Sequence, residues 1–322
     1  MVKNLEELMD IARNQARADV FKVMSNEEEA AKALDHFKSL PDEHLDSMGL
    51  ISGIPKHQLP VYRAMIRGEE NEYFAQMKEF DGVLQSGDVI LVTGKKFRSK
   101  ALVAAQFPFY TKARASHVAM VHADFICIDA MPGEGVQNRT IAEVLDDIED
   151  NWRIIRFNAV TEDNRDCMLQ QCAFYLQQPY SIKPKKGAGA KFSYCSELVS
   201  KIYQDCKVRC IKAPKGVLVN PYHFDRLADK GEACQDITET VRPFLPFLME
   251  YKAMLAMQAK LFIGGLQLNR YRDKERRDLL ASMQSLAKSG RISHETLVAV
   301  ANQIEAMERK MNFRFWDSTP RQ

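Results

Sequence analysis

Residues 116–131, SHVAMVHADFICIDAM, decide the fold of this chain. Two runs of β-branched and apolar residues flank a short polar segment, a pattern that predicts a β-hairpin. Side chains alternate between the two faces of a strand, so the length of the connecting loop fixes which residues lie opposite one another. With a three-residue loop at 122–124, His117 faces Asp129 directly across the two strands.

This pairing would give His117 the surroundings of a catalytic base. The carboxylate of Asp129 would accept one ring N–H and fix the tautomer that leaves the other nitrogen free to take a proton. A two-residue loop would shift the register and destroy the pairing. Taken alone, His117 also fits a structural histidine at the edge of a strand, and His122 in the turn and His223 in PYHFDRL are rival bases.

Residues 192–203, FSYCSELVSKIY, carry the candidate nucleophile Cys195. Apolar residues recur from Cys195 to Ile202 at the i, i+3, i+4, i+7 spacing of a buried helix face, with Ser193 as a candidate N-cap. In a first helical turn, free N–H groups and the helix dipole favour a thiolate over a thiol. The same spacing fits a cysteine that only packs the end of a helix, so position alone does not decide.

The rest of the chain predicts an α+β organisation with helices at both ends. Strands are indicated in 83–94, VLQSGDVILVTG, and in 151–160, NWRIIRFNAV, and a helix is expected over 161–178. Helical spacing dominates before residue 80 and after residue 235. We therefore expect a helical segment at 1–80, a catalytic domain at 81–235 and a second helical segment at 236–322.

The segment 183–192, KPKKGAGAKF, lies directly before the candidate nucleophile. Its glycines, Gly187 and Gly189, permit backbone states closed to other residues, and its lysines discourage burial. This composition predicts a mobile loop that gates the cleft. A solvated connector with no effect on catalysis fits the composition equally well.

Composition excludes several classes of protein. The 45 basic and 43 acidic residues nearly cancel, which gives no reason to expect nucleic acid as a partner. The charged N-terminal stretch is no Sec signal, and the most apolar stretch, 244–268, is interrupted by charges, so we expect a protein made in the cytosol with no membrane span. The seven cysteines form no CxxC pair, so we expect reduced thiols, no metal site and no cofactor.

Taken in order, SGDVILVTG, SHVAMV, ICIDAMPGEGV and YCSELVSKIY resemble the permuted NlpC/P60 group, the papain-like amidases of the YiiX and YaeF type, over about residues 82–230. The resemblance implies an antiparallel sheet packed on the nucleophile helix. Matching residues are Gly87 and Asp88 in the first motif, His117 as base, Asp129 as orienting acid and Cys195 as nucleophile. The family more often has Glu at the acid position, and the terminal helices have no counterpart in it.

The resemblance implies a cysteine hydrolase that cleaves an amide of the peptidoglycan-peptide type through an acyl-enzyme. Backbone N–H groups near Cys195 would hold the oxyanion, and Tyr194 is either a further donor or substrate contact or a packed aromatic. The aromatic run QFPFY, 106–110, either walls the cleft or joins the core. The alternatives are a lipid acyl ester or thioester hydrolase or acyltransferase, and a non-catalytic module whose helical ends dock a protein. A peptidoglycan substrate would make the chain a bacterial effector exported by a route other than Sec.

Overall fold

The computed structural model describes residues 27–182, 192–208 and 218–310. Six strands of this part form one antiparallel sheet in the order β4-β3-β2-β1-β5-β6. The strands are β1 (Val89–Val92), β2 (His117–Ala123), β3 (Ile126–Met131), β4 (Gly135–Thr140), β5 (Arg153–Phe157) and β6 (Cys234–Asp236). The sheet and its flanking helices confirm the predicted α+β class.

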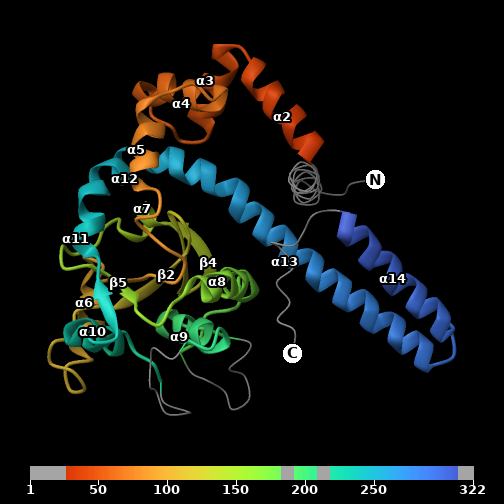
Figure 1. Cartoon of the computed structure of the whole chain (residues 1–322). Helices are drawn as coiled ribbons and strands as arrows, with labels where there is room; N and C mark the ends of the chain where they lie inside the picture. The colour runs from red at the N-terminus through yellow and green to blue at the C-terminus, as the bar shows by residue number, and fades with distance from the viewer. Residues whose placement is uncertain (1–26, 183–191, 209–217, 311–322) are drawn as a thin grey trace.

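Helices precede, interrupt and follow the sheet (Figure 1). Before it come α2 (Glu27–Ser39), α3 (Asp42–Ile51), η1 (Lys56–Gln58), α4 (Leu59–Arg67) and α5 (Glu72–Phe80). Within the sheet region lie α6 (Phe97–Ala104), α7 (Ile141–Val144), α8 (Glu162–Tyr175), α9 (Cys195–Asp205) and α10 (Pro221–Lys230). After it come α11 (Thr238–Val241), η2 (Arg242–Phe244), α12 (Leu245–Glu250), α13 (Lys252–Lys288) and α14 (His294–Lys310).

The sheet has a separate hydrophobic core on each face. Alternate residues of the central strand β1 point to opposite sides. Ile90 packs with residues of α3, α4, α5, α12 and α13, whereas Leu91 packs with residues of α8, α9 and α10. Helices from both ends of the chain therefore share one core with the sheet, while the helix that begins at Cys195 packs on the other face. The boundaries at residues 80 and 235 remain a prediction.

The β2–β3 hairpin corrects the predicted register. Ala123 pairs with Ile126, so the chain turns in two residues, and a bulge between Val121 and Ala123 then shifts the register to Met120 opposite Ile128. The direct pairing of His117 with Asp129 is therefore wrong. A two-residue turn alone would have sent the side chains to opposite faces, but the extra residue of the bulge restores the parity. His117 and Asp129 thus share a face, offset diagonally by two residues.

The Gly87-Asp88 motif builds the turn that enters β1. Gly87 has a φ of +97°, which favours glycine, and a Cβ there would lie 2.5 Å from Met168 Sδ, so another residue would strain the backbone and displace the Met168 side chain. Asp88 is buried, and its carboxylate accepts from the Gln85 N–H at 2.8 Å and from the Arg156 guanidinium at 2.6 and 2.8 Å. The motif therefore ties β1 to β5.

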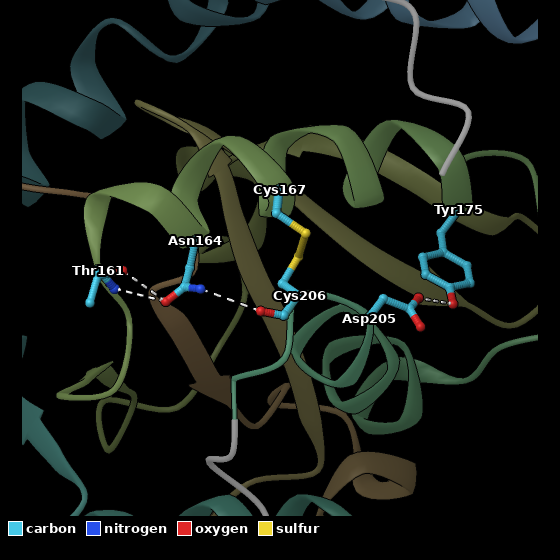
Figure 2. Close-up of a disulfide and its surroundings, with 6 residues drawn as sticks. All are labelled: Thr161, Asn164, Cys167, Tyr175, Asp205 and Cys206. Carbon is cyan, nitrogen blue, oxygen red and sulfur yellow. Dashed lines mark hydrogen bonds between the residues drawn. A yellow bond between two sulfur atoms is a disulfide. The ribbon is translucent and has the colours of Figure 1, made fainter. Parts of the chain in front are cut away.

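A disulfide joins Cys167 of α8 to Cys206, directly after α9, with their Cα atoms 5.6 Å apart (Figure 2). The Asn164 side chain donates to the Cys206 carbonyl close by, at 3.3 Å. The expectation of reduced thiols is wrong for this pair. The two cysteines are 39 residues apart in sequence and meet only because α8 and α9 pack together, which sequence spacing could not show.

Residues 1–26 of the predicted N-terminal helical segment and nearly all of the predicted gating loop, 183–191, lie outside the described residues. Among the described residues no helix is long and apolar enough to cross a membrane.

Candidate active site

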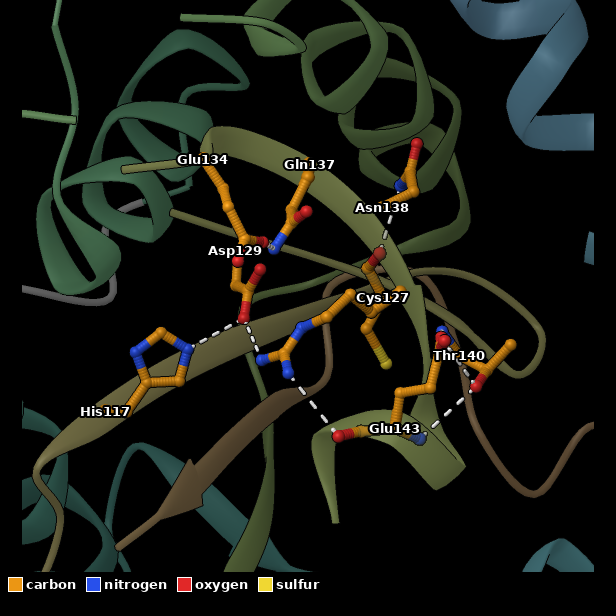
Figure 3. A network of polar contacts seen from close by, with 9 residues as sticks. His117, Cys127, Asp129, Glu134, Gln137, Asn138, Thr140 and Glu143 are labelled. Carbon is orange, nitrogen blue, oxygen red and sulfur yellow. Dashed lines mark hydrogen bonds and ion pairs between the residues drawn. The ribbon is translucent and has the colours of Figure 1, made fainter. Parts of the chain in front are cut away.

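His117 and Asp129 meet at the end of β2. The Nε2 atom of His117 lies 2.8 Å from Oδ2 of Asp129, whose residue is only 1% exposed (Figure 3). A carboxylate in this position makes Nε2 the protonated nitrogen of a neutral ring. The other ring nitrogen, Nδ1, is then the one that remains for a proton transfer.

Cys195 is the first residue of α9 and is 7% exposed. The ladder between β2 and β3 begins only at Met120, so the N–H of Val118 is available to the cysteine sulfur. His117 and the backbone N–H groups of Val118 and Ser196 lie close enough to the Cys195 side chain to lower the pKa of its thiol. The first turn of α9 thus places the thiol beside the start of β2, where β2 and β3 are no longer paired.

The surroundings of Cys195 favour a thiolate. Burial alone would raise the pKa of this thiol, but the hydrogen bond from His117, the charge of His117 and the backbone N–H groups outweigh burial and lower it. Burial also lowers the pKa of His117, yet its bonds and attractions to Asp129 and Cys195 raise the net value to about 9. The two shifts describe one coupled pair, in which thiolate and imidazolium stabilise each other.

Arg139 of β4 completes the polar network and was missed by the sequence analysis. Its guanidinium donates to the same Oδ2 of Asp129 that contacts His117 (Figure 3). Burial would raise the pKa of Asp129, but His117 and Arg139 hold it below its usual range. Positive and negative groups therefore alternate along one chain of contacts. They are the Arg139 guanidinium, the Asp129 carboxylate, the His117 imidazolium and the Cys195 thiolate, and their charges sum to zero.

The signal for Arg139 was present in the sequence. The β3–β4 hairpin pairs Met131 with Gly135 and Cys127 with Arg139. The turn at PGEG, 132–135, would have fixed this register, and the parity argument used for the first hairpin would then have placed Arg139 on the face of Asp129.

The two rival histidines have structural roles. His122 is fully buried, with Nε2 3.1 Å from the Leu169 carbonyl and Nδ1 2.9 Å from Asn138, and burial lowers its pKa to about 4. His223 accepts the Asn220 N–H at 3.0 Å within a capping box that begins α10, and burial lowers its pKa as well. The structure brings neither of them to Cys195.

Two tyrosines lie beside the thiol. Tyr194 is the N-cap of α9 and is buried, and burial raises the pKa of its phenol. Ser193, the expected N-cap, instead donates to Gln178 at 2.9 Å. Burial and then the charge of Cys195 raise the pKa of Tyr180 to about 12, which places this half-buried phenol near the sulfur. Tyr180 reaches the site through a bridge to Ser193 that no local pattern predicts.

The phenylalanines of the run QFPFY, 106–110, do not join the core, and its place as a wall of the cleft beside His117 stays a prediction. Gln106 is buried, but Phe107 and Phe109 are 45% and 65% exposed. Among the residues that the structure describes, no group of three or more His, Cys, Asp or Glu side chains is arranged to hold a metal ion.

A thiol at a helix start, coupled to a histidine that an acid orients, defines the class of papain-like cysteine hydrolases. A model of the permuted papain-like amidase enzymes, the YaeF/YiiX or C92 family, matches residues 83–241. This part of the chain belongs to that family, and Cys195, His117, Asp129 and Arg139 all lie within it.

A crystal structure of the metalloprotein yiiX from Escherichia coli O157:H7 is also similar, with 24% identity and a TM-score of 0.31. The match covers 38% of this chain and 66% of that protein. No significant match to a curated protein was found.

Proposed function

We propose that this protein hydrolyses an amide bond of a peptide substrate of the peptidoglycan type, with Cys195 as nucleophile, His117 as acid and base, and Asp129 as the group that orients His117. The observation that carries the proposal is the coupling of the Cys195 thiol to a histidine whose Nε2 is held at 2.8 Å by a buried carboxylate. A cysteine that only packed a helix end would need no such partner.

In the proposed reaction the thiolate of Cys195 attacks the carbonyl carbon, a C–S bond forms, and the carbonyl electrons move to the oxygen. The Cys195 N–H, which as the first of a helix has no acceptor inside that helix, is suited to hold the oxyanion. Collapse of the intermediate breaks the C–N bond, and the leaving amine takes the proton of the His117 imidazolium. A water molecule, deprotonated by His117, then hydrolyses the thioester and releases the free thiolate.

The phenol of Tyr180 is the better placed of the two tyrosines to contact the substrate carbonyl. Its pKa responds to the Cys195 charge directly after burial, and it is half-exposed, whereas Tyr194 is buried. Tyr194 is thus proposed to support the site from behind rather than to donate to the oxyanion.

Hydrolysis of two sets of substrates tests the proposal: muropeptides, with release of an amine, and acylated lipids, with release of a fatty acid. Cys195→Ala should abolish turnover, whereas Cys172→Ala, which removes a buried thiol from the neighbouring helix α8, should retain it. Turnover of muropeptides by Cys195→Ala at the wild-type rate would disprove the nucleophile. Cleavage of acylated lipids alone would keep the nucleophile and replace the peptide substrate with a lipid one.

A further inference from the structure

The segment 95–116 forms an exposed, basic and apolar projection that the proposed chemistry does not use. It contains α6 and the loop that leads to His117, and in Figure 1 α6 lies on the outside of the domain beside α10. No residue of α6 is buried. Because none of the eight residues of α6 is buried in the core, the apolar side chains of this helix are available to contact a partner outside the domain.

Large apolar side chains are concentrated on this projection. Phe97 is 86% exposed, Leu102 52%, Phe107 45% and Phe109 65%. Scattered single apolar residues are normal on a protein surface, but four exposed ones within thirteen consecutive positions, 97–109, form a cluster in the sequence.

The charge of the projection has one sign. Residues 95–116 contain six basic residues and no Asp or Glu, although basic and acidic residues are nearly equal over the whole chain. Lys100 lies 2.8 Å from Glu149 and Arg114 lies 3.7 Å from Asp229. The described residues contain no ion-pair partner for the other basic residues, which are Lys95, Lys96, Arg98 and Lys112.

The base of the projection is fixed to the domain. The Gln106 side chain donates to the Ala115 carbonyl at 2.9 Å and accepts the Tyr222 N–H of α10 at 2.8 Å. The buried carboxylate of Asp225 accepts the N–H groups of Arg114 and Ala115 at 2.8 and 2.9 Å. Phe109 stacks on Tyr222 with an interplanar angle of 10°. These hydrogen bonds and the stacked ring hold the backbone that carries the exposed phenylalanines in a fixed position.

We propose that the projection 95–116 docks the protein on an anionic phospholipid bilayer. Basic side chains around exposed Phe and Leu are the combination that binds at the lipid interface, because the cations meet the headgroups while the apolar groups enter the acyl boundary. The exposed aliphatic side chain of Leu102 favours a lipid over a single-stranded nucleic acid, whose bases stack on aromatic side chains. Because the segment is followed directly by His117, docking would hold the site close to the membrane surface.

Sedimentation with vesicles tests this surface independently of the hydrolysis proposed above. The full chain should bind vesicles made of equal parts of phosphatidylcholine and phosphatidylserine, and bind pure phosphatidylcholine much less. Replacing Lys95, Lys96 and Arg98 with Gln should weaken binding about 100-fold, since each basic residue contributes about fivefold. Phe97→Gln should weaken it about tenfold.

Matched control substitutions can be made at residues that lie outside segment 95–116. Ile51→Gln, at an 88% exposed position of α3, controls for Phe97→Gln, and Lys56, Lys78 and Lys288, each replaced with Gln, control for the basic triple variant. An unchanged rate of Cys195 alkylation in every variant shows that the fold and the site are intact.

Equal binding to both kinds of vesicle, or an equal loss in the control variants, would overturn the proposal. Binding of an RNA oligonucleotide or of an acidic protein without any binding to vesicles would assign the charge to that partner and would overturn it as well. Loss of vesicle binding leaves Cys195 and its hydrolysis unaffected, so the two proposals fail separately.

Discussion

The two ends of α9 differ in the groups that surround them. At its start, Cys195 lies among charged groups at the place where β2 and β3 separate. At its far end, the Tyr203 hydroxyl donates to the Gly87 carbonyl at 2.5 Å, and Cys206 is bonded to Cys167 of α8. One end of the helix is fastened by groups that do not titrate near neutrality, whereas the other presents a reactive sulfur. The fastening fixes the axis along which the sulfur is presented.

Each end also has a buried Asp–Arg pair, and these two pairs differ in one respect. Asp88 and Asp129 are both 1% exposed, and both bind a guanidinium. Burial raises the pKa of Asp88 despite Arg156, whereas His117 and Arg139 together lower the pKa of Asp129 against the same effect of burial. Arg156 does not offset desolvation at Asp88 even with the charge of Arg165 and the Gln85 N–H beside it, whereas Arg139 and the hydrogen-bonded His117 do so at Asp129. The hydrogen-bonded histidine is thus what the Asp88 carboxylate lacks.

We expect the largest change in the reactivity of the Cys195 thiol from His117→Ala. Without the histidine, the thiol of Cys195 keeps only its backbone donors, and burial favours the neutral form. A thiol with an ordinary pKa of about 8.5 is only a few per cent ionised at pH 7, so alkylation of Cys195 by iodoacetamide should slow at least about thirtyfold. Hydrolysis should fall by about 10³ or more, because the general acid is also lost.

The control is His223→Ala, which removes a histidine from the start of α10. Mass spectrometry of the Cys195 peptide measures the alkylation rate. Wild-type alkylation in His117→Ala would show that the helix start alone activates the sulfur and would remove the histidine from the mechanism.

Much of this site was predictable from residue types and alternation. The sulfur at a helix start and the shared face of His117 and Asp129 follow from spacing and parity. The bulge at the β2–β3 hairpin was not predictable, because a residue inserted in one strand leaves no mark in the pattern, and here its effect happened to restore the expected face. Tyr180 and the disulfide partner of Cys167 depend on how segments pack in space, which local sequence does not encode.

A smaller effect on the thiol is expected from Arg139→Gln. Asp129 then loses one of the two cations that hold its pKa down, so burial raises it. In the proposed mechanism the ionised form of Asp129 orients His117, and this form is lost as the pH falls through the pKa of Asp129, so the acid limb of kcat/KM should move to higher pH. We expect a loss of about tenfold near pH 5 and little change near pH 8.

The same shift has a consequence for stability. In the native protein the lowered pKa of Asp129 contributes stability above the ordinary carboxyl pKa of about 3.9, and this contribution is lost as the pH falls through the lowered value.

Two further variants are controls for Arg139→Gln. Arg139→Lys keeps the charge and should restore most of the acid limb of the kcat/KM profile. Arg156→Gln breaks the other buried pair, and should lower Tm without moving that limb. Identical pH profiles for Arg139→Gln and the wild type would show that Arg139 serves the fold alone.

The smallest effect on the thiol should come from the far end of α9. Cys206→Ser removes the disulfide that closes 39 residues between α8 and α9, which the chain-entropy estimate values at about 3–4 kcal/mol of unfolding free energy. Cys195 lies at the other end of the helix. At the Cys206 end the hydrogen bond from Tyr203 to the Gly87 carbonyl remains, as does the one from Tyr175 to Asp205, which Figure 2 shows, and both keep α9 attached. Denaturant unfolding should therefore show the full loss of stability, while the alkylation rate of Cys195 changes by less than about twofold well below the transition. Reduction of the wild-type protein should give the same two results, and Cys172→Ala, which removes a buried thiol of α8 outside the disulfide, is the control for substitution in that helix. A fall in alkylation that matches the loss of stability would mean that the two ends of α9 act as one unit and that the disulfide sets the position of the nucleophile.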